Sequence, residues 1–159
     1  MRVGIAGYGL AGRYFHAPLL KGCGYEVVAI ATGNAERSIH AKTDFPDVHV
    51  VPTIEDLVAH ELDLVVVASA NIVHAQHAIA AINAGIAVVI DKPMGRTYAE
   101  TQEIISAGDR ARVPVSTFFN RRWDKCRYRL GVYYKCSNYS RNYTNCLCSV
   151  LGSWIVYGW

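Results

Sequence analysis

Three glycines, Gly7, Gly9 and Gly12, follow directly after the apolar run Arg2–Ala6. Glycines at this spacing, between a strand and a helix, are typical of a turn that binds the phosphates of a dinucleotide. The first permits a tight turn, the second keeps a side chain away from a pyrophosphate, and the third lets the helix pack closely on the strand. The positive end of that helix would face the phosphates. A glycine-rich turn without a ligand is the alternative. The predicted phosphate-binding residues are Gly7, Tyr8, Gly9, Leu10, Ala11 and Gly12.

The segment after the second predicted strand bears on which dinucleotide would bind. An NAD site commonly has Asp or Glu about 20 residues beyond the glycine motif, where the carboxylate binds ribose hydroxyls. Here Thr32 and Asn34 occupy that region, no carboxylate occurs between Glu26 and Glu36, and Arg37 is close by. A carboxylate would repel a 2′-phosphate, whereas a guanidinium would bind one. The segment favours NADP over NAD; the alternative is that Arg37 is a solvated charge on a helix.

Short apolar runs alternate with helical patterns up to about residue 120, and these elements would position the candidate residues. Continuous β-branched runs such as LVVVAS indicate strands covered on both faces. Thr97 with Glu100, and Thr53 with Asp56, predict capped helix starts, and Gly85 predicts a helix end. The alternation predicts an α/β fold with a doubly wound parallel sheet, the Rossmann fold. Strands are predicted at Arg2–Ala6, Glu26–Ala31, His49–Val51, Asp63–Ala68, Ala87–Asp91 and Val115–Phe118, and helices at Ala11–Lys21, Ala35–Asp44, Ile54–Ala59, His74–Ala84 and Tyr98–Arg112.

Three stretches resemble the Gfo/Idh/MocA family, which is named after glucose–fructose oxidoreductase and inositol dehydrogenase. They read GYGLAGRYFHAPLL, DLVVVASANIVHAQHAIAAINAGIAVVIDKPMG and FFNRRWD, so the resemblance covers residues 1 to about 124. It implies a nicotinamide-binding Rossmann domain followed by a larger α/β domain with an open antiparallel sheet. It also implies hydride transfer between the nicotinamide and a carbon of a sugar or cyclitol.

The resemblance singles out Lys92 as the catalytic residue, within the sequence Asp91-Lys92-Pro93. Removing hydride from a secondary alcohol requires removal of the hydroxyl proton, and an ammonium beside that oxygen can orient it and relay the proton. Without the resemblance, a surface lysine in a turn would be the preferred interpretation. The family more often has Glu where Asp91 stands. The candidate cofactor residues on this side of the cleft are Ser69, Asn71, His74, Asp91, Lys92 and Pro93.

Two histidines have alternative interpretations. His74 follows the fourth predicted strand and would line the nicotinamide side of the cleft together with Asn71. A histidine that merely begins a helix is the alternative for His74. Ala70 stands where many family members have proline, which bears on the shape of this loop. His16, on the first helix, is interpreted as a packed or capping histidine in preference to a catalytic one.

Composition excludes several other classes of protein. The 159 residues carry a formal net charge of +3 and are 52% apolar, as expected of a globular chain. No run approaches the roughly 20 apolar residues of a spanning helix, and no signal peptide is recognisable. We therefore expect no nucleic-acid partner, no membrane partner and a cytoplasmic location. No metal site is predicted, because the cysteine spacing does not match a zinc site.

The pattern changes after residue 124. The remaining residues contain no Asp, Glu or His, but they hold four of the five cysteines and six of the ten tyrosines. We interpret residues 1–120 as the dinucleotide-binding domain and residues 121–159 as the start of a second domain followed by an atypical tail. A shift of reading frame near Asp124 would produce such a tail. The chain would then lack the substrate domain, and we expect little or no dehydrogenase activity from it.

Two further hypotheses compete with an incomplete NAD(P)-dependent oxidoreductase. One is a non-catalytic module that senses the dinucleotide or binds a partner, and it would not need Lys92. The other is a small redox protein that uses the tail cysteines, which the absence of a CxxC pair disfavours. The expected substrate is a small sugar or cyclitol, and homo-oligomers are expected for full-length members of the family.

Overall fold

The computed structural model describes residues 1–119 of the chain. Expectations about residues 120–159, including the atypical tail, its cysteines and the start of a second domain, lie outside the described residues. Within residues 1–119, no helix is long and apolar enough to cross a bilayer.

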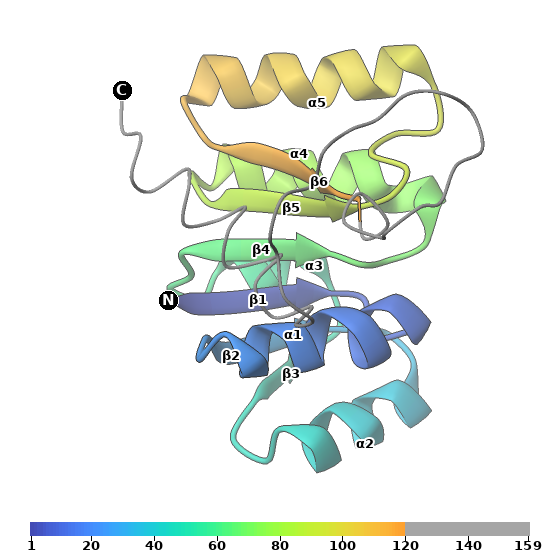
Figure 1. Ribbon diagram of the computed structural model, residues 1–159, viewed down its shortest axis with the longest axis vertical. Coiled ribbons are helices and arrows are strands. Elements are labelled where there is room, and N and C mark those ends of the chain that lie inside the picture. The colour runs from blue at the N-terminus through green and yellow to red at the C-terminus, as the bar shows by residue number, and fades with distance from the viewer. Residues whose placement is uncertain (120–159) are drawn as a thin grey trace, which may run out of the picture.

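Six strands form one sheet in which every neighbouring pair is parallel (Figure 1). The strand order is β3-β2-β1-β4-β5-β6. The chain adds β2 and β3 on one side of β1, and then crosses back to add β4, β5 and β6 on the other side. The carboxyl ends of β1 and β4 therefore flank the point where the order reverses, which is where sheets of this type bind ligands. The strands are β1 (Arg2–Ala6), β2 (Glu26–Ala31), β3 (His49–Val51), β4 (Leu64–Val67), β5 (Ala87–Asp91) and β6 (Val115–Phe118).

Helical segments cover both faces of the sheet (Figure 1). One core cluster joins β1, β2 and β4 to the first two helices, through residues such as Ile5, Leu20 and Ala41. The other joins the opposite face to the later helices, through residues such as Val65, Ile82 and Ile104. The helical segments are η1 (Gly12–His16), α1 (Ala17–Gly22), α2 (Ala35–Asp44), α3 (Ile54–Val58), η2 (Asn71–Val73), α4 (His74–Asn83) and α5 (Tyr98–Ala111).

The predicted fold and most predicted boundaries are confirmed. Thr97 accepts a hydrogen bond from the Glu100 N–H, Thr53 accepts one from the Asp56 N–H, and Gly85 has the left-handed φ of +76° expected after a helix. The fourth strand is one residue shorter at each end than predicted. The first helix differs more, because it opens with the wider π-helical turn η1, in which the Ala17 N–H bonds to the Gly12 carbonyl. Hydrophobic periodicity carries no signal for such a local widening.

Gly12 is where the first helix approaches the turn after β1 most closely. A Cβ added to Gly12 would lie 2.1 Å from the Gly7 carbonyl oxygen, a backbone atom that no side-chain rotation can move. We expect Gly12→Ala to lower the free energy of unfolding by about 1–3 kcal/mol, since the helix must shift. Urea unfolding would measure the loss. Gly33→Ala is the matched control, because its added Cβ would meet only the Pro52 oxygen at 4.0 Å. Equal stability of the two variants would contradict the close approach.

Candidate functional site

The turn after β1 sits between the carboxyl ends of its two neighbouring strands. The Gly7 N–H bonds to the Ala31 carbonyl at the end of β2, 2.9 Å away. Gly7 has a φ of +98°, and a Cβ there would lie 2.6 Å from the Cα of Ser69, just beyond β4. Only glycine combines this conformation with this approach. The turn is thereby fixed at the point where strand order reverses.

Gly9 differs from its two neighbours in the motif, because the protein leaves space beside it. A Cβ added to Gly9 would lie 3.7 Å from both Cζ and Nη1 of Arg37, which is ordinary van der Waals distance. The first helical bond beyond the turn runs from the Arg13 N–H to the Gly9 carbonyl, 2.9 Å. N–H groups ahead of that bond point out of the helix end. The open side of Gly9 is thus bordered by a helix N-terminus and by a guanidinium, both of which attract anions.

Local hydrogen bonds hold Arg37 at this position. Asn34 caps α2, its Oδ1 accepting the Arg37 N–H at 2.9 Å. The Asn34 N–H in turn makes a long contact of 3.4 Å with Thr32 Oγ1, and the Thr32 N–H bonds to the Val51 carbonyl at the end of β3. The exposed side chain of Arg37 therefore projects from a capped helix start at the carboxyl edge of the sheet.

Tyr8, between the two glycines, points into the protein. Its ring is 1% exposed, and its hydroxyl donates to Asp44 Oδ2 at 3.0 Å. Arg13 Nε donates to the same oxygen at 2.7 Å, and Arg13 Nη2 lies 3.3 Å from Asp44 Oδ1. The last residue of α2 is thereby joined to the turn and to η1. This network fixes the helix that carries Arg37 relative to the glycine motif.

The opposite wall of the crevice comes from the loop after β4. Ser69 Oγ is buried and has no hydrogen-bond partner in the part of the chain that the structure describes. Asn71 is exposed and begins η2. His74 is 1% exposed, and its two ring nitrogens lie 2.8 Å from the Pro93 carbonyl and 3.0 Å from the Ser69 carbonyl. This wall therefore combines an unsatisfied hydroxyl with a histidine whose polar atoms both contact the protein.

Lys92 lies in the turn that follows β5. Its side chain is exposed, its N–H donates to Asp91 Oδ1 at 2.9 Å, and the Lys92–Pro93 peptide bond is cis. Burial raises the pKa of Asp91, but the interaction with His16, together with the Lys92 N–H and charge, outweighs burial and lowers this pKa. His16 Nε2 is 3.9 Å from Asp91 Oδ1, too long for a direct hydrogen bond, so we regard its effect as mainly electrostatic. Asp91 is thus an anion that holds the backbone of the turn.

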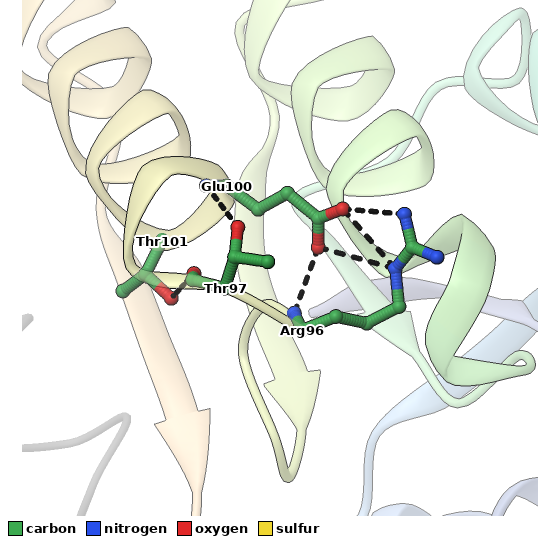
Figure 2. A network of polar contacts seen from close by, with 4 residues as sticks. All are labelled: Arg96, Thr97, Glu100 and Thr101. Carbon is green, nitrogen blue, oxygen red and sulfur yellow. Dashed lines mark hydrogen bonds and ion pairs between the residues drawn. The ribbon is translucent and has the colours of Figure 1, made fainter.

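A second set of contacts holds the far end of this turn (Figure 2). The Arg96 N–H donates to Glu100 Oε2 at 2.7 Å, and the Arg96 guanidinium pairs with the same carboxylate at 2.6 Å. Thr97 caps α5 through the Glu100 N–H, and the Thr101 hydroxyl donates to the Thr97 carbonyl. The exposed ion pair adds little energy, but the backbone bond from Arg96 fixes where the loop enters α5.

The family model of the Gfo/Idh/MocA oxidoreductases, described as an oxidoreductase family with an NAD-binding Rossmann fold, matches residues 1–119. The chain belongs to this family. The match extends over every strand and helix described above. The crevice at the reversal of strand order therefore lies within the Rossmann domain of a Gfo/Idh/MocA oxidoreductase.

Similar proteins act on cyclitols and sugar nucleotides, as their names state. The chain is 40% identical over 126 residues to scyllo-inositol 2-dehydrogenase (NADP(+)) IolW of Bacillus subtilis, a match that covers 78% of this chain and 34% of that relative. Among solved structures, the WlbA dehydrogenase from Bordetella pertussis in complex with NADH and UDP-GlcNAcA is 27% identical, with a TM-score of 0.72 over 77% of this chain and 38% of that one. Myo-inositol 2-dehydrogenase from Lactobacillus plantarum is 25% identical, with a TM-score of 0.72 over 79% and 38% of the two chains. The chain thus spans little more than a third of these relatives' lengths.

The structure brings most of the predicted site residues of this Gfo/Idh/MocA chain to one edge of the sheet, with different exposures. Gly9, Arg37, Asn71 and Lys92 border the crevice or reach solvent beside it, and Leu10 is 70% exposed. The polar atoms of Tyr8 and His74 contact the protein itself. His16 is fully buried and packs against Phe118, as expected of a packed histidine. Residues 1–119 contain no group of three or more potential metal ligands.

Sequence reasoning missed Asp44, Arg13, Arg96 and Glu100 as residues that support the site. Asp44 lies 36 residues from Tyr8 in the sequence, and nothing in the pattern around it marks a buried partner. Glu100 was recognised only as part of a capping box. Its spacing of four from Arg96 on a helix start is a signal that could have identified the pair.

The network around Asp44 makes stability depend on pH. The hydrogen bond from Arg13, with that from Tyr8 and the charge of Arg13, lowers the pKa of the Asp44 carboxyl despite burial. Stability from this carboxylate is therefore present above its unfolded pKa of about 3.9 and is lost as pH falls through the lower folded value. We expect Asp44→Asn to be less stable than the native chain at pH 7 and the difference to shrink near pH 3, by urea unfolding. Asp47→Asn, at an exposed position, is the control. A difference that stays constant with pH would contradict this assignment.

Proposed function

We propose that the crevice binds NADP(H) in preference to NAD(H), through the glycine turn and Arg37. The observation that carries the proposal is the guanidinium of Arg37 beside the open face of Gly9. In a dinucleotide site the ribose nearest the end of the second strand carries either a free 2′-hydroxyl or a 2′-phosphate. Thr32 and Asn34 occupy that strand end without a carboxylate, so nothing there would repel a phosphate.

The residues present fit a dinucleotide. Gly9 has no side chain in the space beside the helix N-terminus, and no other part of residues 1–119 fills that space. The buried Ser69 Oγ on the opposite wall lacks a partner within the same residues, and a polar ligand group could supply one. The name of the relative IolW includes NADP(+), which agrees with this preference. The fitting residues are Gly7, Tyr8, Gly9, Leu10, Ala11, Gly12, Thr32, Asn34, Arg37, Ser69, Asn71, His74, Asp91, Lys92 and Pro93.

We further propose that Lys92 serves oxidation or reduction at a hydroxyl-bearing carbon of a cyclitol or sugar. Bound NADP+ supplies the hydride acceptor when the alcohol is oxidised. The Lys92 amine would accept the hydroxyl proton, and in the reverse direction its ammonium would donate a proton to the carbonyl oxygen. The substrate class follows from relatives named as inositol dehydrogenases. Residues 1–120 would form the cofactor domain, and the wall opposite Lys92 would come from the part of the protein that follows this domain.

A fluorescence titration of the purified chain with NADPH and NADH tests the cofactor proposal. We infer that NADPH binds more tightly than NADH. Tighter binding of NADH would overturn the choice of cofactor but not the site. Binding of both without any turnover that depends on Lys92, in a chain supplied with the family's second domain, would favour a nucleotide-sensing module instead.

Gly9→Val tests the site itself. Valine would place its side chain in the space beside the helix N-terminus, so we expect NADPH binding to fall below detection while the fold is retained. Circular dichroism would monitor the fold, and NADPH fluorescence would measure the binding. Ala111→Val, at an exposed position at the end of α5, is the control. Undiminished NADPH binding by Gly9→Val would show that the phosphates lie elsewhere.

Arg37→Gln tests the choice of cofactor. A charge-assisted hydrogen bond contributes about 1.5–3 kcal/mol, so we expect the ratio of NADPH to NADH affinity to fall tenfold or more. Thr32→Asp should shift the ratio in the same direction, because a carboxylate binds ribose hydroxyls and repels a phosphate. Arg110→Gln, at an exposed position of α5, is the matched charge control. An unchanged ratio in both site variants would place the discriminating residue elsewhere.

A further inference from the structure

His74 connects the two loops that follow the neighbouring strands β4 and β5. It begins α4, and its ring stands between the Pro93 carbonyl, 2.8 Å from Nδ1, and the Ser69 carbonyl, 3.0 Å from Nε2. Pro93 follows Lys92 after β5, whereas Ser69 follows β4. The imidazole is therefore the direct polar link between the turn that carries Lys92 and the loop that carries Ser69 and Asn71.

Both contacts can be hydrogen bonds at the same time in only one form of the ring. A carbonyl oxygen accepts and cannot donate, so each ring nitrogen must carry a proton. Neutral imidazole has one N–H, and its other nitrogen would present a lone pair to a carbonyl oxygen. We propose that His74 is a positioning residue which, in its doubly protonated form, ties the Lys92 turn to the Ser69 loop. The consequence for catalysis rests on the function proposed above, because it concerns where Lys92 is held.

Burial of the His74 ring opposes this charge, and its contacts with two carbonyl oxygens favour it. The start of α4 also opposes it, since a helix N-terminus disfavours positive charge. The neighbouring titratable groups are His77 on α4, which interacts electrostatically with His74, and Glu55 on α3, which acts on His77. Asp91 and Lys92 belong to the turn whose Pro93 carbonyl contacts the ring. Burial lowers the pKa of His77, so this neighbour is held toward its neutral form and repels the His74 cation less.

The other hydrogen bonds of the Lys92 turn join it to different elements from the one that His74 joins it to. Asp91 holds the Lys92 N–H, and Glu100 holds the Arg96 N–H and guanidinium. Both of these fix the turn to its own flanking strand and helix. His74 fixes the turn across the sheet, to the neighbouring strand end. Loss of the ring's second proton would release one of its two carbonyls and let the Lys92 turn and the Ser69 loop separate.

NMR of the ¹⁵N-labelled full chain tests the charge state directly. Ring nitrogens of imidazolium and of each neutral tautomer have distinct shifts, and the signals absent from His74→Gln identify His74. We expect both nitrogens to be protonated at pH 6, and one to lose its proton when the pH is raised. The backbone amide of Lys92 should shift with the same midpoint. A single neutral tautomer at pH 6, or a Lys92 amide that ignores the titration, would overturn the proposal.

Two conservative variants separate the two halves of the link. The amide of Asn stands near the position of Nδ1 and that of Gln near Nε2, so His74→Asn keeps a donor to Pro93 and His74→Gln keeps one to Ser69. In both, the pH-dependent shift of the Lys92 amide should disappear. His49→Gln, at an exposed histidine on β3, should retain it. Persistence of the shift in His74→Asn and His74→Gln would assign it to another group.

NADPH affinity adds a functional measurement. We expect His74→Ala to bind NADPH about tenfold more weakly than the native chain, and His74→Asn to recover part of the loss because it still holds the Lys92 turn. If His74→Ala does not fold, the comparison of His74→Asn with the native chain at pH 6 carries the same test. Failure of the native chain to bind NADPH would refute the proposed function and leave the NMR result to decide on His74. Normal NADPH binding with a neutral ring would refute the positioning role alone.

Discussion

The close approach of the first helix to the turn after β1 is the constraint on which the rest of the crevice depends. A Cβ added to Gly12 would lie 2.1 Å from the Gly7 carbonyl oxygen, and a Cβ added to Gly7 would lie 2.6 Å from the Cα of Ser69. These contacts bring a helix N-terminus, the end of β2 and the end of β4 to one point. Because β1 lies at the reversal of strand order, this point is also where sheets of this type bind ligands. A bulkier residue at either position would move the helix end away from the site.

The architecture could be predicted because its signals are local in the sequence. Strands such as LVVVAS are continuous apolar runs, and the caps at Thr53 and Thr97 follow from pairs three residues apart. The glycine motif could be read for the same reason, since all three glycines lie within one turn. Spacing therefore located the crevice and Arg37 beside it. The roles of the individual site residues stay predictions, since no ligand is present.

The supporting contacts could not be predicted because their partners are distant in the sequence. Tyr8 finds Asp44 across 36 residues, and His74 finds Pro93 across 19. Such partners depend on how helices pack against the sheet, which the pattern of apolar residues sets only to within a helical turn. Tyr8 and His74 therefore read as cofactor contacts in the sequence, yet their polar atoms bond within the protein. The π-helical turn η1 could not be predicted either, because a 3.6-residue period of apolar residues does not encode it.

The distinction between backbone and side chain bears on how Lys92 should be interpreted. Its N–H is fixed by Asp91, and the carbonyl of the next residue is fixed by His74. Its ammonium, in contrast, makes no hydrogen bond or close ion pair with residues 1–119, apart from its longer-range effect on Asp91. A lysine kept only for stability would be expected to use its charge in packing or pairing. A position whose backbone is tied on both sides while its charge is left exposed at the crevice has the properties of a group held ready for a ligand. The neighbours of Lys92 therefore hold its backbone, and its side chain is left unpaired within residues 1–119, as the role proposed for it requires.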